Sequence, residues 1–221
     1  MLKSLFKIFS SFLERKHFYL IKSLCYTDQQ KFLPANLDYV RYTSLALCCQ
    51  EISVKKLQGN LAEVGVYKGN FAKQINALFP DKKLYLFDTF EGFSESDISV
   101  EKQEGYSAAN QDFSATSINL VKSKMKYPQN CIFKKGFFPD TAKDVDDTFC
   151  FVSLDADLFS PIYEGLKFFY PKLVSGGYIF VHDFNNVHYR GARESVIKFC
   201  REEKIGFVPI PDVCGTAIIT K

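Results

Sequence analysis

A short apolar run that leads directly into a glycine turn constrains this chain more than any other feature. Residues 59–71 read GNLAEVGVYKGNF, with glycines at Gly65 and Gly69 and helix-forming residues over 72–79. Glycine adopts positive φ angles readily and lets the backbone approach a ligand where a Cβ would collide. The stretch therefore predicts a strand, a tight turn and a helix whose N-terminus helps to cradle a ligand.

The spacing of the turn indicates the kind of ligand. A dinucleotide-binding turn reads G-x-G-x-x-G around a pyrophosphate, whereas this chain reads E-x-G-x-x-x-G, with Glu63 inside the strand. Glu63 would repel an anion but attract the amino and sulfonium groups of S-adenosylmethionine. The pattern resembles motif I of the class I methyltransferases. Glycine pairs also occur in ordinary turns, so a purely structural role for these two glycines remains the alternative.

A second carboxylate ends the next predicted strand. Residues 83–88 read KLYLFD, and Asp88 comes nineteen residues after Gly69. An acid about twenty residues beyond a glycine turn is the recurring partner of a nucleoside ribose at the edge of a parallel sheet. Asp88 is therefore predicted to accept hydrogen bonds from the cofactor ribose.

The composition allows one sizeable α/β domain and argues against nucleic acid as a partner. The chain has 221 residues, 47% of them hydrophobic, and 28 basic against 25 acidic side chains give a net charge of +3. We see no basic stripe with interleaved aromatics. The seven cysteines are scattered, without a C-x-x-C pair. They indicate reduced core residues and a cytoplasmic location, in agreement with the absence of a recognisable signal peptide or membrane-spanning run.

Strands and helices alternate along most of the chain. Apolar runs predict strands over 59–64, 83–88, 131–133, 149–154, 178–181, 206–210 and 216–220. Periodicity predicts helices over 38–56, 72–79, 117–125, 161–173 and 191–203. This alternation predicts a three-layer α/β fold of the Rossmann-like class I methyltransferase type, with a mostly parallel sheet and a C-terminal antiparallel hairpin. Residues 1–58 are assigned to an N-terminal helical extension, and residues 59–221 to an S-adenosylmethionine-binding methyltransferase domain.

Two segments stand apart from this alternation. Residues 1–25 have the pattern of one or two basic amphipathic helices. Such a helix packs on the core or on a second subunit, or contacts an anionic membrane surface, and we expect a homo-oligomer. Residues 91–116 are polar with little periodicity, which predicts a lid over the bound ligands or a disordered loop.

Polar side chains collect where two central strands end. Asp155 and Asp157 follow the strand 149–154, and His182 and Asp183 follow the strand 178–181. Open α/β sheets bind ligands beyond the carboxyl ends of their strands. Crowded carboxylates repel one another unless a cation joins them, and oxygen ligands suit Mg²⁺ or Ca²⁺. The alternative is that these acids only cap the helices that follow.

Five strings together resemble the macrocin O-methyltransferase (TylF-type) family. They are EVGVYKG over 63–69, FDTFEGF over 87–93, GFFPDT over 136–141, LDADL over 154–158 and FYPKLVSGGY over 169–178. The resemblance implies S-adenosylmethionine- and divalent-metal-dependent methylation of a sugar hydroxyl on a deoxysugar or surface-polysaccharide precursor. It implies that Asp155 and Asp183 bind the metal and that Asp157 is the general base. With the glycine turn it assigns the cofactor to Glu63, Gly65, Tyr67, Gly69, Asp88, Thr89, Gly136 and Phe137.

His182 departs from the family pattern, in which a second Asp precedes the metal-binding Asp. If the chain alternates strictly, only Asp183 reaches an all-oxygen site, for which Mg²⁺ suffices. If the chain has already turned, the His182 nitrogen joins the site and favours softer ions such as Mn²⁺. We favour the oxygen site, because a histidine beside a ligand more often orients a carboxylate.

Two other functions remain as alternatives to sugar methylation. One is metal-dependent methylation of catechols or other small phenols. The other is a catalytically silent cofactor-binding protein, which the departure at His182 suggests. The sequence does not specify the acceptor or the hydroxyl that is methylated.

Overall fold

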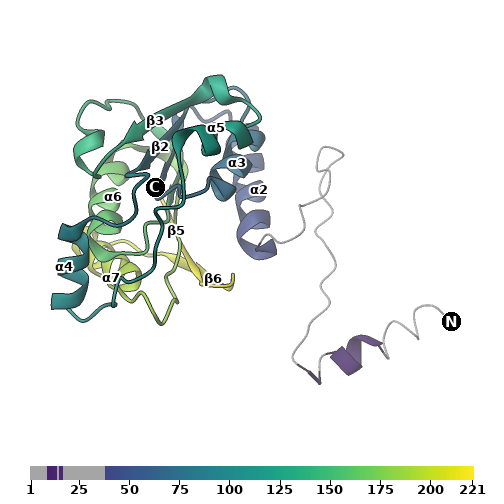
Figure 1. Ribbon diagram of the computed structural model, residues 1–221. Coiled ribbons are helices and arrows are strands. Elements are labelled where there is room, and N and C mark those ends of the chain that lie inside the picture. Colours follow the sequence, from purple (N-terminus) through teal and green to yellow (C-terminus); the bar gives the residue numbers. More distant parts are fainter. Residues whose placement is uncertain (1–8, 14, 17–37) are drawn as a thin grey trace. The chain divides into compact units, whose positions relative to one another are not determined.

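The computed structural model describes residues 9–13, 15, 16 and 38–221 (Figure 1). The chain divides into two compact units, residues 1–35 and residues 36–221. In the first unit, residues 9–13 are helical. The rest of the amphipathic pattern expected for residues 1–25 lies outside the described residues, apart from 15 and 16, and its membrane and subunit contacts stay predictions.

The second unit is built on one sheet of seven strands, in the order β3-β2-β1-β4-β5-β7-β6. β1 to β5 are parallel, whereas β7 runs antiparallel to both β5 and β6. The strands are β1 (Asn60–Val64), β2 (Leu84–Asp88), β3 (Cys131–Lys135), β4 (Phe149–Leu154), β5 (Leu173–Val181), β6 (Val208–Ile210) and β7 (Thr216–Thr220). The predicted fold class, a mostly parallel sheet with a C-terminal antiparallel hairpin, is confirmed.

Helices cover both faces of the sheet (Figure 1). They are α2 (Tyr39–Val54), α3 (Asn70–Leu78), α4 (Glu95–Gln103), α5 (Ile118–Lys124), α6 (Phe159–Lys172) and α7 (Gly191–Glu203), with 3₁₀ turns at η1 (Pro128–Asn130) and η2 (Asp140–Ala142). α2, α3 and α5 share one buried cluster, and α6 and α7 share another. Successive strand residues enter opposite clusters: Leu61 joins the first and Ala62 the second. This two-sided burial explains why the strands are apolar almost throughout.

The domain boundary predicted at residue 58 stays a prediction. α2 lies before that boundary, yet its Leu45 and Ile52 are buried in the same cluster as Leu61 of β1. Asp38 begins the helix, because its Oδ1 accepts hydrogen bonds from the amides of Val40 and Arg41. α2 thus belongs to the core that supports the strand ends.

Two expectations about local structure are wrong. Residues 91–116 are not a disordered loop throughout, because they contain α4, which Ser94 caps by accepting a hydrogen bond from the Asp97 amide. The lid expected of this segment stays a prediction. Its buried residues are the acids Asp97 and Glu101, so apolar periodicity gave no signal. The strand expected from Tyr178 begins five residues earlier, since β5 continues through Gly176, whose φ is +82° and whose amide donates to Lys221 O.

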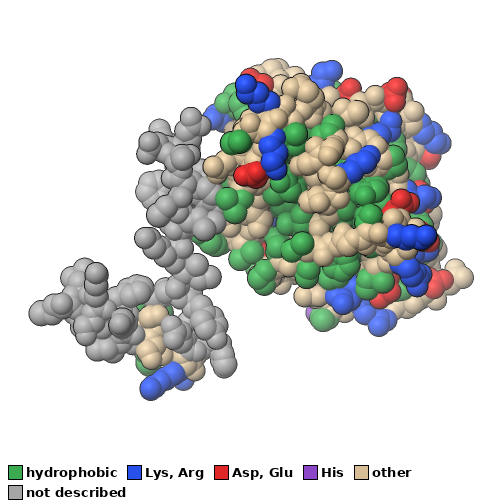
Figure 2. Space-filling model, turned by 180° about the vertical axis from the view of Figure 1, so that it is seen from behind, with side chains coloured by type: hydrophobic (Ala, Val, Ile, Leu, Met, Phe, Trp, Pro, Cys, Tyr) green, Lys and Arg blue, Asp and Glu red, His purple; other side chains and the backbone are tan. Residues whose placement is uncertain are grey.

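The surface shows no continuous basic stripe on the face in Figure 2, where Lys and Arg side chains alternate with Asp and Glu around hydrophobic side chains. Among the described residues, no helix has the length and apolar character needed to cross a membrane. The sheet ends on one side in β3, which carries Lys134 and Lys135, and on the other in β6, whose central residue is Pro209.

Candidate functional site

The glycine turn between β1 and α3 is tightly wound. Gly65, Tyr67 and Gly69 all have positive φ angles, of +82°, +47° and +71°. A Cβ on Gly65 would lie 2.1 Å from the carbonyl oxygen of Asp155, so this position accepts only glycine. Gly69 is the N-cap of α3, and a Cβ there would lie 2.8 Å from Val121 Cγ1. The turn is therefore shaped by close backbone approach, as the sequence predicted.

Asp88, at the end of β2, holds this turn in place. Its Oδ2 accepts hydrogen bonds from the amides of Val66 and Tyr67, at 2.7 and 2.8 Å, and its Oδ1 accepts from Phe90 N at 2.6 Å. A carboxylate oxygen has two lone-pair directions, so further hydrogen bonds to a ligand remain possible. The sequence predicted the ribose contact but not the support of the turn.

One pocket of about 510 Å³ opens at the carboxyl ends of the strands. Every predicted site residue lines it except Gly69. The lining includes Glu63, Gly65, Tyr67, Asp88, Thr89, Gly136, Phe137, Asp155, Asp157, His182 and Asp183. Phe93, Asp97 and Phe113 also line it, so the segment around α4 forms one wall. The fold thus brings the predicted cofactor residues and the acid cluster into a single cavity.

Glu63 is the most deeply buried acid of this pocket, with 1% of its surface exposed. Burial, and then repulsion by Asp155, raise its pKa well above the usual value. Its Oε2 has no hydrogen-bond partner within the described part of the chain. A buried acceptor without a partner is costly unless a ligand supplies a donor.

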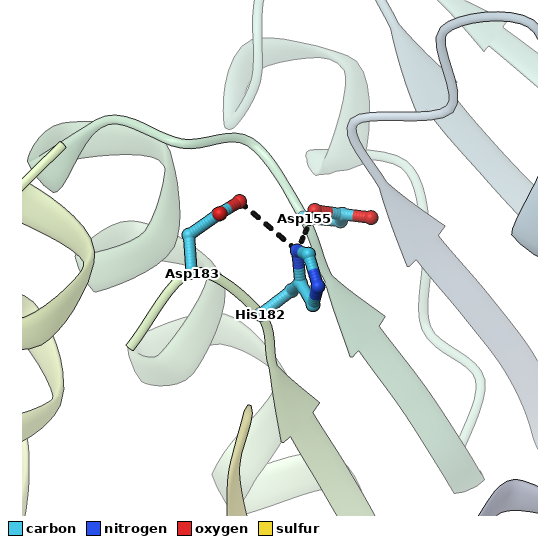
Figure 3. Close-up of side chains that lie close together, drawn as sticks. All are labelled: Asp155, His182 and Asp183. Atoms are coloured by element: carbon cyan, nitrogen blue, oxygen red, sulfur yellow. Dashed lines mark hydrogen bonds and ion pairs between the residues drawn. The ribbon is translucent and has the colours of Figure 1, made fainter. Parts of the chain in front are cut away.

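His182, Asp155 and Asp183 meet at one point (Figure 3). His182 Nδ1 lies 3.0 Å from Asp155 Oδ1 and 3.0 Å from Asp183 Oδ2. The chain has already turned here, because Asp183 has a φ of +59°. Strict alternation, the condition under which only Asp183 would reach the site, therefore does not hold, and His182 lies beside both carboxylates. Whether His182 binds a metal or orients the two carboxylates stays a prediction.

The outer atoms of these three side chains face other polar groups. Asp155 Oδ2 accepts from Arg41 Nη2 at 2.9 Å, and Asp183 Oδ1 accepts from Asn186 Nδ2 at 2.9 Å. His182 Nε2 faces Asp212 Oδ2 at 3.9 Å. Each residue therefore has one atom directed to the common point while its other polar atom is held or faced by a neighbour.

This arrangement fits a divalent cation. Neighbouring ligands of an octahedral ion, each about 2.1 Å from the metal, lie about 3 Å apart, which matches the two 3.0 Å separations at His182 Nδ1. Without a metal, a proton on Nδ1 accounts for the same distances as hydrogen bonds. The donor set of two carboxylates and one imidazole suits Mn²⁺ as well as Mg²⁺.

The charges in the cluster shift the pKa of each member. Burial alone would lower the pKa of His182, but the charge of Asp155 and hydrogen bonds to both carboxylates raise it to about 10. Burial alone would raise the pKa of Asp155 and Asp183, but Arg41 and His182 hold that of Asp155, and His182 that of Asp183, below the usual value. In the absence of a metal, the cluster is therefore an imidazolium between two carboxylates.

Asp157 differs from its neighbours because none of the cationic side chains in the described part of the chain forms an ion pair with it. Burial, and then repulsion by Asp183 and Asp155, raise its pKa well above the usual value. Its φ is +58°, a conformation that most side chains avoid but that Asp and Asn tolerate. A buried carboxyl with a raised pKa is suited to accept a proton during a reaction.

Sequence reasoning did not assign the contacts that three residues make in this site: Arg41, Asn186 and Asp212. Arg41 is 7% exposed, and its guanidinium stacks on Phe71 at 3.8 Å from the ring centre. Its position on the buried side of a helix was the available signal, but its partner Asp155 lies 114 residues away. Nothing in the sequence indicated Asn186 or Asp212, which lie in loops.

The sequence profile of the macrocin O-methyltransferase (TylF) family matches residues 34–220. The chain belongs to this family. Its resemblance to TylF proteins, inferred above from five strings, is thereby confirmed. Arg41, His182 and Asp212 all lie within the matched range.

Two curated relatives are methyltransferases of Streptomyces. The chain is 22% identical over 156 residues to demethyldecarbamoylnovobiocin O-methyltransferase of Streptomyces niveus. It is 20% identical over 156 residues to 8-demethyl-8-(2,3-dimethoxy-alpha-L-rhamnosyl)-tetracenomycin-C 4'-O-methyltransferase of Streptomyces olivaceus. Each match covers 65% of this chain and 60% of the relative, so the chain spans less than two thirds of their length.

Solved structures of other methyltransferases share the fold. The O-methyltransferase NovP superposes with a TM-score of 0.70 at 19% identity, over 85% of this chain and 84% of NovP. The calicheamicin methyltransferase CalS11 gives 0.65 at 17% identity, over 81% and 78% of the two chains. TomG of Streptomyces achromogenes, solved with S-adenosylmethionine, gives 0.55 at 13% identity, over 81% and 80%.

Proposed function

We propose that this TylF-family protein is an S-adenosylmethionine- and divalent-metal-dependent O-methyltransferase that acts on a sugar hydroxyl. The observation that carries the proposal is the placement of Asp155, His182 and Asp183 around one point, with Asp157 beside them in the pocket of the glycine turn. The curated relatives, whose names describe O-methylation, and the bound S-adenosylmethionine of TomG support it.

The β1–β3 side of the pocket would hold the cofactor. Glu63 offers a buried acceptor to the amino group, and Asp88 offers lone pairs to the ribose. Thr89, Gly136 and Phe137 would border the remaining nucleoside. The glycine turn lets the cofactor approach the backbone, since Gly65 has no Cβ.

The β4–β5 side would activate the acceptor. The cation would be held by Asp155 Oδ1, His182 Nδ1 and Asp183 Oδ2. The spacing of these atoms supports this assignment. When bound, the cation lowers the pKa of a hydroxyl and orients its oxygen, and S-adenosylmethionine supplies the methyl group. Asp157 takes the hydroxyl proton, while Arg41 and Asn186 fix the two carboxylates. Most of the remaining acceleration comes from holding both reactants in line.

The test is methyl transfer from labelled S-adenosylmethionine to a panel of glycosides, nucleotide sugars and catechols, after treatment with EDTA and after addition of Mg²⁺ or Mn²⁺. We expect methyl transfer to a sugar hydroxyl. EDTA should abolish this transfer, and added metal should restore it. Calorimetry without an acceptor should detect cofactor binding. Absence of cofactor binding would refute the proposal. EDTA-resistant transfer would refute its metal requirement, and transfer to catechols alone its acceptor class.

A further inference from the structure

A buried carboxylate outside the pocket, Glu101 of α4, lies where two helices begin. Its side chain is fully buried, with 0% exposed. Glu101 Oε1 accepts a hydrogen bond from the amide of Phe159, the first residue of α6, at 2.6 Å. Glu101 Oε2 accepts from Ser107 Oγ at 2.6 Å. Both oxygens are therefore occupied by donors, one of them 58 residues away in the sequence.

The first turn of α7 packs against the same carboxylate. A Cβ on Gly191, the first residue of α7, would lie 2.2 Å from Glu101 Oε1 and 2.7 Å from Phe159 N. Just before it, Arg190 N donates to Tyr106 O at 3.2 Å, and Arg190 Nη2 donates to Gly105 O at 2.6 Å. The end of α4 and the residues that directly follow it thus contact the start of α7 as well as that of α6, and Figure 1 shows the three helices together.

Both helices lack a capping side chain of their own. The N-cap residues are Leu158 for α6 and Arg190 for α7, and neither makes a side-chain cap hydrogen bond. The N-terminal amides of a helix need acceptors, and its dipole favours a negative charge there. Glu101 provides both from a distant segment, for α6 by a direct hydrogen bond and for α7 by its proximity to Gly191.

The two helices follow the two loops that carry the acids. Asp157 lies two residues before Phe159, and Asp183 lies in the turn that leads to Arg190. Asp157 and Asp183 both have positive φ angles, so their backbone needs support from outside the loops. A carboxylate that ties together the ends of both loops also fixes the separation of the two acids.

We propose that Glu101 is a positioning residue of the methyl transfer reaction, which holds the Asp157 loop and the Asp183 loop in their relative places. This rests on the proposed function. Glu101 does not line the pocket, so it acts only through the starts of α6 and α7. Glu101 therefore does not position the β1–β3 side of the pocket.

The kinetic test compares Glu101→Ala, Glu101→Gln and the control Glu104→Ala, an exposed residue after the same helix. We expect Glu101→Ala to lower kcat by about tenfold to a hundredfold, because small misplacements of reacting groups cost this much. Its Kd for S-adenosylmethionine should stay within about twofold of the wild-type value. Glu101→Gln retains an acceptor for the Phe159 amide and should recover most of the rate, and Glu104→Ala should match wild type.

Two outcomes would overturn the inference: an unchanged kcat in Glu101→Ala, or equal losses of kcat and cofactor affinity, which indicate a general loss of structure. If Glu101→Ala does not fold, Ser107→Ala removes only the second hydrogen bond and should show the same split with a smaller loss of kcat.

Hydrogen exchange separates this inference from the proposed function. Even if wild type methylates no acceptor, Glu101→Ala or Ser107→Ala should speed amide exchange in residues 157–160 and in 189–193, but not in the glycine turn. Faster exchange confined to α4 would overturn the positioning role.

Discussion

The two sides of the pocket are formed by different kinds of chemical group. On the β1–β3 side, the groups that shape the cavity are backbone atoms: the amides of Val66 and Tyr67 bind Asp88, and Gly65 packs on the carbonyl of Asp155. On the β4–β5 side, the groups are ionisable side chains that shift one another's pKa. The pKa of His182, for example, is raised to about 10. The first side should respond to pH only through its buried acid Glu63 and should not depend on metals, whereas the second should respond to both pH and metals.

The largest expected effect is at Asp157, where activity and stability should change in opposite directions. Asp157→Asn removes the proton acceptor and should lower kcat by about a hundredfold or more. Asn tolerates the positive φ and carries no charge to repel Asp183. Because burial and repulsion disfavour the ionised carboxyl of Asp157, thermal unfolding near pH 7 should show that the variant is more stable than wild type.

The size of that gain depends on pH. A carboxyl whose pKa is raised by folding destabilises the native state as pH rises above its unfolded pKa, because it must then ionise at a cost. The gain from Asp157→Asn should therefore disappear below about pH 3.8, the ordinary value of this carboxyl. A variant less stable than wild type at pH 7 would contradict the repulsion inferred at this site.

The second prediction tests the backbone-built side. Asp88→Ala removes the two oxygens that accept three backbone hydrogen bonds, together with any ribose contact. The Kd for S-adenosylmethionine should therefore rise by about tenfold to a hundredfold, at about 1 kcal/mol or more for each hydrogen bond. Calorimetry measures this directly, with the exposed Asp112→Ala as control. Mn²⁺ affinity should stay unchanged, and a parallel loss of metal binding would mean that the two sides are not independent.

The third prediction concerns pH and the charged side. His182 must lose its proton before Nδ1 binds a metal, and its pKa is raised to about 10 in the metal-free protein. Apparent Mn²⁺ affinity should therefore increase with pH, by up to about tenfold per unit. Calorimetry in buffers of different ionisation enthalpy should count one proton released from this ring. The control His182→Asn should lose that proton, and pH-independent binding in wild type would exclude His182 as a ligand.

The smallest expected effect is a change of metal preference. His182→Asp replaces a nitrogen donor by an oxygen donor, so activity with Mg²⁺ should increase relative to activity with Mn²⁺ by several-fold, on the order of the differences between such donors. The ratio of the two activities is the measurement, since it cancels changes in protein concentration. An unchanged ratio would place His182 outside the metal site.

The sequence predicted those features that depend on residues close together along the chain. The strand ends were visible because apolar runs stop at Asp88, Leu154 and Val181, and parallel strands align such ends at one edge. The hairpin of β6 and β7 followed from its short connection. These predictions rest on periodicity and spacing, which need no knowledge of tertiary contacts.

What could not be predicted depends on partners far away in sequence. Arg41 meets Asp155 across 114 residues, and Glu101 meets Phe159 across 58. α4 was taken for loop because its buried residues are the acids Asp97 and Glu101. The partner of Glu101 is the N-terminus of another helix. The position of His182 depended on the turn at Asp183, and sequence periodicity does not report where a strand stops alternating.

The ends of the sheet have a consequence for how copies of this protein associate. Along β6 the central residue, Pro209, has no N–H to offer, and β3 presents Lys134 and Lys135 at the opposite margin. Proline and lysine on marginal strands discourage a neighbouring chain from adding a strand. Concentrated solutions should therefore resist fibrillar growth from this sheet, and any homo-oligomer would form through helices or loops instead of a shared intermolecular sheet.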